Sequence, residues 1–197
     1  MAGPANARIW VTWCPPPLKI ARRRAPEDAK GLLLASFEDP NPVLFFEHKA
    51  LYRSLSGEVP DDYYTVEIGK ARLAREGREV SVITYGMGVH WAMEICEEMG
   101  VDADILDLRT LLPLDYEAIA ESVKKASRVI ILHEDTLVGG IGAEIAAYIS
   151  EHLFEYLDAP VLRSASLDTP VPFAAKLEEQ FLPKGRFREQ LERLLAY

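Results

Sequence analysis

The sequence has little cysteine and no long apolar run. Its 197 residues include only Cys14 and Cys96, which excludes a disulfide framework of the secreted kind and a cysteine-based metal cage. No apolar stretch approaches the roughly 18 residues that cross a bilayer, and the N-terminus lacks the continuous apolar stretch of a signal peptide. These absences predict a soluble protein of a reducing, cytoplasmic compartment, or of the mitochondrial matrix in a eukaryote.

Acidic side chains outnumber basic ones outside the first 24 residues. The net charge is −9 at pH 7, yet residues 1–24 hold five basic side chains and no acid, so the remaining chain is strongly acidic. Such an excess of negative charge argues against a nucleic-acid partner. A mitochondrial transit peptide is a second interpretation of the Arg-rich start, but Pro15–Pro17 would break the amphipathic helix that it needs. We expect residues 1–24 to be irregular or disordered.

Regular patterning begins at residue 25. "APEDAKGLLLASFEDPNP" predicts a helix that a Pro/Asn turn ends, and "VLFFEH" predicts a buried strand. A single helix–strand unit cannot bury both faces of its strand. We therefore expect exposed apolar surface around Leu44, Phe45 and Phe46, and self-association or a partner that covers it. The segment "LSGEVPDDYYT", residues 55–65, is typical of a linker.

From residue 66 the chain alternates between strand and helix patterns. Four short apolar runs predict strands, namely "EVSVITYG", "ADILDLRT", "RVIILHE" and "APVLRSAS". One of the intervening helices is predicted to end at Gly100 and another to be capped by Asp115, while "KGRFREQLERLLAY" predicts a terminal helix. Strands that alternate with such helices pair in parallel through right-handed crossovers. Residues 66–197 are predicted to form a three-layer α/β domain with a mostly parallel sheet.

Three glycines in "TLVGGIGAEIAAYI", residues 136–149, stand between a strand and a helix. Gly140 and Gly142 supply the start of a dinucleotide-binding turn, but Ile145 takes the place of its third glycine, and no P-loop lysine follows. Glu144 in the first helical turn would also repel a phosphate. We expect the glycines to supply unusual backbone angles and a close approach of helix to strand.

One acid/base cluster stands at the carboxyl end of a predicted strand. His133, Glu134 and Asp135 lie where open α/β sheets usually bind ligands. They have no partner at metal-ligand spacing, so the interpretation that we favour is a polar strand end at a domain or subunit interface. His48, His90 and His152 are scattered elsewhere, and Cys96 lies on an apolar helix face. No nucleophile elbow accompanies them.

Several long motifs resemble those of one known family. They are "PEDAKGLLLASFEDPNPVLFFEHKALYR", "DLRTLLPLDYEAIAESVKKASRVIILHEDTLVGGIGAEIAAYI", "YLDAPVLRSASLDTPVPFA" and "LEEQFLPKGRF". From about Pro26 to Tyr197 the sequence is similar to the beta subunit of the thiamine-diphosphate-dependent decarboxylating component of 2-oxo acid dehydrogenase complexes. The residues around "HEDTL" favour the branched-chain (2-oxoisovalerate) type, although pyruvate enzymes are similar here.

The resemblance implies a domain organisation and the loss of the family's catalytic histidine. Residues 66–197 would form a transketolase C-terminal-like domain, preceded by a remnant of the family's pyrimidine-binding domain at 25–54, and the chain would be truncated at its N-terminus. Where the family has a catalytic histidine, "WCPPPLKI" has Trp13 or Cys14, and an indole cannot handle protons near neutral pH. We expect no catalytic and no cofactor-binding residue here, so the chain would be mainly a scaffold and docking domain.

The same resemblance implies cofactors and partners. In the intact family complex, thiamine diphosphate and Mg²⁺ serve oxidative decarboxylation with acyl transfer to lipoyl, and an alpha subunit completes a heterotetramer. A potassium ion would be held by the turn "SFEDPN", through Ser36, Phe37, Asp39 and Asn41. The acyltransferase core's subunit-binding domain would dock on Asp158 and the terminal carboxylate of Tyr197. A homodimer or higher oligomer is also expected.

Two rival function classes stay open. The first is a non-catalytic interaction module that binds the acyltransferase core or a sister subunit. The second is a nucleotide-binding enzyme built on the glycine turn, which predicts saturable binding of NAD or ATP.

Overall fold

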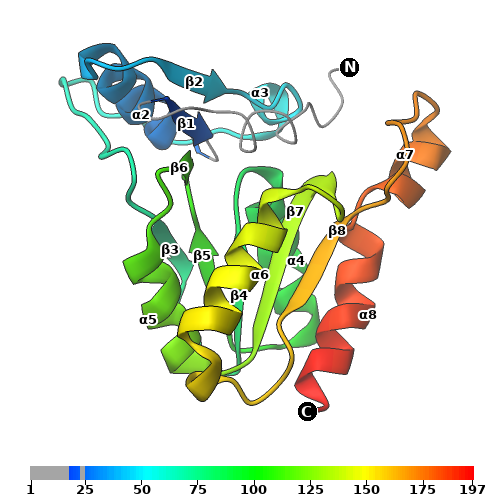
Figure 1. Cartoon of the computed structure of the whole chain (residues 1–197). Helices are drawn as coiled ribbons and strands as arrows, with labels where there is room; N and C mark the ends of the chain where they lie inside the picture. The colour runs from blue at the N-terminus through cyan, green and yellow to red at the C-terminus, as the bar shows by residue number, and fades with distance from the viewer. Residues whose placement is uncertain (1–17, 23–24) are drawn as a thin grey trace.

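The computed structural model describes residues 18–22 and 25–197. They form a five-stranded sheet with helices on both faces and a smaller three-stranded sheet near the carboxyl ends of the large sheet's parallel strands (Figure 1). The large sheet has the strand order β3-β5-β4-β7-β8, in which β3 is antiparallel to β5 and the other pairs are parallel. The expected three-layer α/β domain with a mostly parallel sheet is confirmed.

Buried apolar strands form the centre of the large sheet. Every residue of β4 and β5 is buried, as expected of parallel strands that helices cover on both faces. The strands of this sheet are β3 (Arg72–Arg75), β4 (Val80–Thr84), β5 (Ala103–Asp107), β7 (Val129–Thr136) and β8 (Leu162–Ser166). All four predicted strands are confirmed, while the short edge strand β3 was not predicted.

Two apolar clusters fill the spaces above and below this sheet. On one face, α4 (Met87–Met99) and α8 (Lys184–Leu195) pack on the strands, and Phe187, Leu191 and Leu194 of α8 are fully buried. On the other face lie α5 (Tyr116–Ala126) and α6 (Ile141–His152). A 3₁₀ turn, η1 (Phe154–Tyr156), and a short helix, α7 (Ala175–Phe181), complete this part.

The predicted helix ends are confirmed. Gly100 ends α4 in the left-handed region at φ +67°, which glycine adopts without steric cost. Asp115 caps α5, because its Oδ1 accepts a hydrogen bond from the Ala118 N–H at 3.2 Å. Cys96 is a core residue, as predicted, and burial raises the pKa of its thiol.

The small sheet joins segments from distant parts of the chain. Its central strand β1 (Lys19–Arg22) runs parallel to β2 (Val43–Phe46) and antiparallel to β6 (Thr110–Leu112). The prediction of an irregular segment over residues 1–24 is therefore wrong for Lys19–Arg22, whereas residues 1–17 and 23–24 lie outside the described part. Four residues are too few to show a strand period, and their partner in β6 is about 90 positions away.

The helix–strand unit packs against the rest of the molecule. It comprises α2 (Pro26–Glu38), β2 and the one-turn helix α3 (Leu51–Ser54). Leu44 and Phe46 pack on the apolar cluster under α5 and α6, and all four residues of β2 are half-buried. The expectation of exposed apolar surface at Leu44, Phe45 and Phe46 is wrong in degree, because these side chains are half-buried although β2 stands at the edge of the small sheet beside β1.

The segment between the two sheets follows the surface of α2. The Tyr64 hydroxyl donates to the Glu27 carbonyl at 2.7 Å, and the Val66 N–H donates to the Gly31 carbonyl at 3.0 Å.

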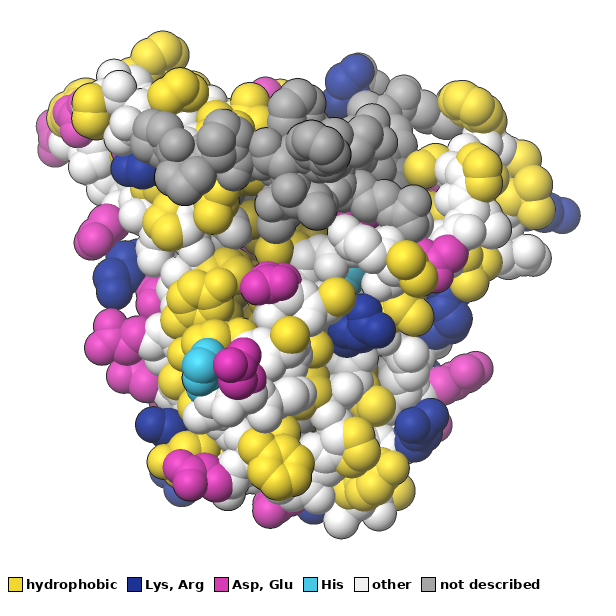
Figure 2. All heavy atoms as spheres, in the orientation of Figure 1, with side chains coloured by type: hydrophobic (Ala, Val, Ile, Leu, Met, Phe, Trp, Pro, Cys, Tyr) yellow, Lys and Arg dark blue, Asp and Glu magenta, His cyan; other side chains and the backbone are white. Residues whose placement is uncertain are grey.

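Acidic and basic side chains are interspersed with hydrophobic ones over the helices on the face shown in Figure 2. None of the helices in the described ranges 18–22 and 25–197 is both long and apolar enough to cross a membrane.

Candidate functional site

The glycines of the turn let α6 pack closely on a buried histidine. A Cβ atom on Gly142 would lie 2.4 Å from His133 Nε2, and one on Gly140 would lie 2.4 Å from the Thr136 carbonyl oxygen. Gly142 therefore lets α6 lie close on β7, as predicted. Gly139 adopts φ +76°, but the expectation of an unusual backbone angle at Gly140 is wrong, because its φ is −77°. Gly140 serves close packing.

The acid/base cluster at the end of β7 meets a histidine from the other sheet. His48 Nε2 lies 2.9 Å from Glu134 Oε1, and both side chains are largely covered. The Ser166 hydroxyl donates to the Glu134 carbonyl at 2.6 Å, which ties β8 to the same point. His133 is fully buried, and its ring lies nearly parallel to that of Tyr85, with centroids 6.4 Å apart. This cluster is a polar contact between the two parts of the molecule.

The described residues do not fit a thiamine diphosphate–Mg²⁺ site. His133 lies on the inner side of the glycine turn, against Gly142, and Gly139 and Gly140 line an open hollow. Within residues 18–22 and 25–197, no group of three or more His, Cys, Asp or Glu side chains is arranged to hold a metal ion. Carboxylate oxygens, which magnesium prefers as ligands, are therefore not clustered in this part of the chain. We assign no catalytic step to these side chains.

A second polar contact holds α2 against the large sheet. Asp28 is 2% exposed, and its two carboxylate oxygens lie 3.2 Å from Arg109 Nη1 and 3.4 Å from Arg72 Nη1. The Glu27 carboxylate also accepts a hydrogen bond from Arg72, which raises the pKa of that guanidinium. We call Asp28, Arg72 and Arg109 the α2 clamp.

Arg109 pairs with Asp28 from a strained backbone position. Its backbone is in the left-handed region at φ +53°, which is unusual for a residue with a side chain. The Asp107 carboxylate accepts from the Arg109 N–H, and the guanidinium donates to the carbonyls of Lys70 and Ala71. These bonds hold the Arg109 side chain toward α2 in spite of the backbone conformation.

The turn with the predicted potassium ligands follows α2. Asp39 Oδ1 accepts from the Asn41 N–H at 3.0 Å and from Asn41 Nδ2 at 3.2 Å, while the other oxygen accepts from the Lys19 ammonium. Ser36 Oγ donates to the Leu32 carbonyl, and the Phe37 side chain is exposed. The Lys19 ammonium thus supplies positive charge to Asp39. Potassium at Ser36, Phe37, Asp39 and Asn41 stays a prediction.

The predicted docking residues are both exposed. The Asp158 N–H donates to the Ser127 carbonyl at 2.9 Å. The Asp158 side chain itself is exposed on the surface. Tyr197 follows α8 and is 57% exposed. The C-terminus lies at the end of the molecule far from the small sheet (Figure 1). Partner docking at Asp158 and Tyr197 stays a prediction.

Two hollows are open on the surface. One, of about 340 Å³, lies between α4 and α8. The other, of about 560 Å³, lies where the turn after β6 meets the start of α6, and it is lined mostly by apolar residues from 111–114 and 139–143. Tyr116 and Glu144 stand at its rim, and burial together with the Glu144 charge raises the pKa of the Tyr116 hydroxyl.

Known proteins share both the sequence and the fold. The chain is 49% identical over 171 residues to the 2-oxoisovalerate dehydrogenase subunit beta of Bacillus subtilis, an alignment that covers 85% of this chain and 52% of that protein. It is 46% identical to the subunit beta of acetoin:2,6-dichlorophenolindophenol oxidoreductase and 43% identical to the pyruvate dehydrogenase E1 component subunit beta of the same organism, again over about half of each relative.

A solved structure described as a split gene transketolase, inactive beta4 tetramer, superposes with a TM-score of 0.73 at 22% identity, covering 92% of this chain and 58% of that one. This likeness shows the fold. The profile of the family described as "Transketolase, C-terminal domain" matches residues 69–186, which include the whole parallel part of the large sheet. The chain belongs to the transketolase C-terminal domain family.

Proposed function

We propose that this chain is the C-terminal part of the beta subunit of a 2-oxo acid dehydrogenase decarboxylating component. The observation that carries the proposal is its 49% identity over 171 residues to a 2-oxoisovalerate dehydrogenase beta subunit. That alignment is much longer than the family match over residues 69–186. The few residues after 186 cannot account for the difference, so the similarity also includes the region of α2 and β2.

The proposed substrate class is a branched-chain 2-oxo acid, with pyruvate as the second candidate. The identity is 49% to the 2-oxoisovalerate relative and 43% to the pyruvate relative. In either case the component would oxidatively decarboxylate the 2-oxo acid and transfer the acyl group to lipoyl. Thiamine diphosphate would supply the carbon nucleophile of that reaction.

Within such a component, the proposed role of this chain is scaffold and docking. Trp13 or Cys14 stands at the position of the family's histidine. Neither an indole nor a thiol reproduces an imidazole that exchanges protons near pH 7. An alpha subunit and the half of a beta subunit that the alignment does not span would therefore have to supply the chemistry.

An assay with the alpha subunit tests this role. The chain is mixed with the alpha subunit of the Bacillus subtilis 2-oxoisovalerate dehydrogenase, thiamine diphosphate, Mg²⁺, 2-oxoisovalerate and a dye acceptor, and the full-length beta subunit serves as positive control. We expect a complex by sedimentation without dye reduction above that of the alpha subunit alone. Dye reduction would contradict the scaffold role. Absence of a complex would contradict the proposal that the chain binds an alpha subunit.

The acyltransferase contact is tested separately. Asp158 and the Tyr197 carboxylate would pair with basic side chains of the core's subunit-binding domain, and charge-assisted bonds of this kind fix register and speed encounter. We expect Asp158→Asn to weaken binding of that domain about threefold, as for an exposed charge pair. Glu155→Gln, a nearby exposed acid, is the matched control. Equal effects of the two substitutions would contradict docking at Asp158.

A non-catalytic assembly of beta chains alone is the second candidate. The observation that favours it is the similar fold of a structure described as an inactive beta4 tetramer. Sedimentation of this chain without an alpha subunit distinguishes the two candidates. A stable tetramer to which the alpha subunit adds nothing would favour the second.

A further inference from the structure

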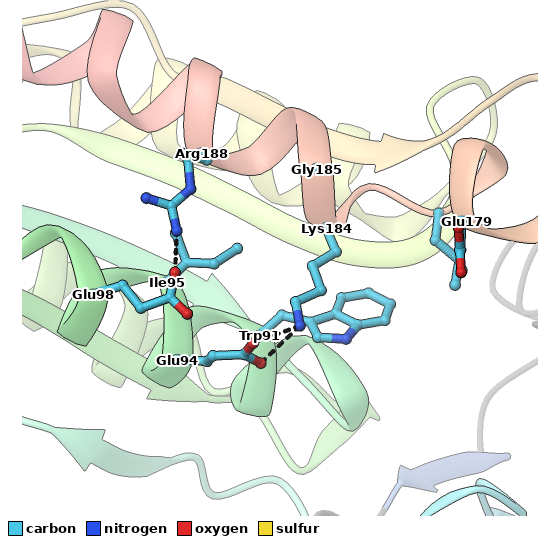
Figure 3. A pocket seen from close by; sticks show the side chains of 9 residues that line it. Trp91, Glu94, Ile95, Glu98, Glu179, Lys184, Gly185 and Arg188 are labelled. Atoms are coloured by element: carbon cyan, nitrogen blue, oxygen red, sulfur yellow. Dashed lines mark hydrogen bonds and ion pairs between the residues drawn. The ribbon is translucent and has the colours of Figure 1, made fainter.

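The groove between α4 and α8 lies outside all the contacts described above. Its walls are Trp91, Glu94, Ile95 and Glu98 from α4 and Lys184, Gly185 and Arg188 from α8, with Glu179 at one end (Figure 3). Leu182 also lines it. We call it the α4–α8 groove. Its volume of about 340 Å³ is at the low end for ligand pockets. It can hold a few side chains but not the face of a whole helix.

The floor of the α4–α8 groove is apolar and aromatic. Trp91 is 8% exposed and Ile95 is 4% exposed, and both belong to the apolar cluster under α4 and α8. Leu182 is half-buried beside them. A rigid indole at the base of a small hollow suits an apolar side chain of a partner, because the two can exclude water from each other.

Two ion pairs cross the groove and neutralise four of its charges. Lys184 Nζ lies 2.7 and 2.8 Å from the two carboxylate oxygens of Glu94, and the Arg188 guanidinium pairs with Glu98 (Figure 3). The four side chains are between 41% and 51% exposed. Exposed pairs of this kind contribute little to stability, but each of the two cations already has a carboxylate beside it.

The remaining charge in the groove is negative. Glu179 of α7 lies across the opening from the Trp91 indole (Figure 3), and within the described part of the chain its carboxylate makes no hydrogen bond or ion pair. An anion entering here would compete with Glu94 and Glu98 for cations that are already paired. A second copy of the chain, with net charge −9, would be repelled at long range.

We propose that the α4–α8 groove is a docking site for a basic segment of another protein, in which an arginine or lysine follows an apolar residue. The apolar side chain lies on Trp91 and Ile95, and the cation pairs with Glu179. Among the charged residues that line the groove, the Glu179 carboxylate is the one without a cation beside it in the described part of the chain. A partner with a positive charge at this point would therefore be complementary to the groove. This inference stands apart from the proposed function, because it uses neither the cofactor nor the alpha subunit.

Titration with blocked dipeptides tests the proposal on the full chain. In a Trp10→Phe, Trp13→Phe background, Trp91 gives the remaining indole N–H resonance in ¹⁵N NMR spectra. We expect acetyl-Leu-Arg-amide to shift that resonance saturably and acetyl-Leu-Glu-amide to bind more weakly. Glu179→Gln should weaken binding of the Arg dipeptide about threefold, as for one exposed charge pair, and should leave the Glu dipeptide no weaker.

Gly185 offers a substitution that blocks the groove. A Cβ atom at this position would meet no atom within 4 Å, so Gly185→Trp places an indole in the opening, and Gly185→Ala is the matched control. We expect Gly185→Trp to abolish the saturable shift and Gly185→Ala to keep it. Equal affinity for the two dipeptides, binding that survives Gly185→Trp, or no saturable shift in the parent chain would overturn the proposal. An indole shift that depends on protein concentration alone would point to a second copy instead.

Discussion

The two sheets of this molecule differ in what covers them. The five-stranded sheet has helices on both faces, and the residues of β4 and β5 are all buried. The three-stranded sheet is built from three short strands, and the four residues of β2 are only half-buried. One of its strands, β6, directly follows β5 of the large sheet. The large sheet can be stable on its own core, whereas the small sheet depends on the large one.

The contacts between the two parts reflect this difference. Asp28 with Arg109, and His48 with Glu134, join the helix–strand unit to the large domain through charged or polar pairs. Ile20, Leu44 and Phe46 add apolar contact with the cluster under α5 and α6. Polar pairs specify geometry more than they add stability. The small sheet is therefore held in a defined position with a modest share of the stabilisation.

Removing apolar volume from the large sheet should have the largest effect. Ile130 of β7 is fully buried, and we expect Ile130→Ala to lower the free energy of unfolding by about 3 kcal/mol through lost burial and a cavity. Leu44→Ala in the half-buried strand β2 is the matched control and should cost about 1 kcal/mol. Urea unfolding followed by circular dichroism measures both. Equal losses would show that the small sheet shares the main core.

Adding volume where α6 packs on β7 should have the next largest effect. The Cβ of Gly142→Ala would overlap the His133 ring and lie 3.3 Å from Ile131 Cγ2. Since His133 is fully buried, its ring cannot move into solvent, and we expect a loss of about 2 kcal/mol. Thermal unfolding measures the stability of this variant and of its control, Gly185→Ala. The added Cβ at position 185 would meet no atom within 4 Å, so the control should lose no stability. A neutral Gly142→Ala would mean that α6 is looser on β7 than these distances require.

Breaking the α2 clamp should increase local unfolding in α2 and the small sheet and leave the large sheet unchanged. Asp28→Asn removes the negative charge between Arg72 and Arg109, which are 39% and 13% exposed at their side chains. Loss of one partner from a buried pair costs several kcal/mol, and this exposure reduces the expected cost to about 1 kcal/mol. Hydrogen exchange should increase in α2 and β2 and stay unchanged in β4 and β7.

Glu117→Gln is the control for the clamp variant. Glu117 pairs with Lys70 at 3.5 Å on an exposed surface, so its substitution should change hydrogen exchange nowhere. Faster exchange in β4 after Asp28→Asn would show that the two parts unfold as one unit.

The sequence predicted the large sheet better than the small one, for a physical reason. The Asp115 cap and the Gly100 helix end are decided within a few residues, so local patterns reveal them. The pairs His48–Glu134 and Asp28–Arg109 join residues 86 and 81 positions apart, and no local pattern marks them. His48 had the right chemistry for a partner of the "HED" cluster. Only the pairing of β1 with both β2 and β6 brings it there.

The contact between β1 and the turn after α2 should give the smallest effect, visible in a single titration. The Lys19 ammonium and the Asn41 N–H donate to the Asp39 carboxylate and hold its pKa below the usual value. A lowered folded pKa means that this contact stabilises the fold above the ordinary aspartate range. The contribution is lost as the pH falls through the folded pKa.

We expect Lys19→Gln to raise the pKa of Asp39 toward its ordinary value in a ¹³C NMR titration of the carboxyl carbon. The stability of the variant should then depend less on pH in the acid range. Lys49→Gln, at an exposed lysine of the same unit, should leave the Asp39 titration unchanged. If potassium, not Lys19, supplied the positive charge at this turn, added KCl would lower the pKa of Asp39 in the wild-type chain, whereas NaCl at equal ionic strength would not. An Asp39 titration that Lys19→Gln leaves unchanged would show that the Lys19 ammonium does not lower the pKa of Asp39.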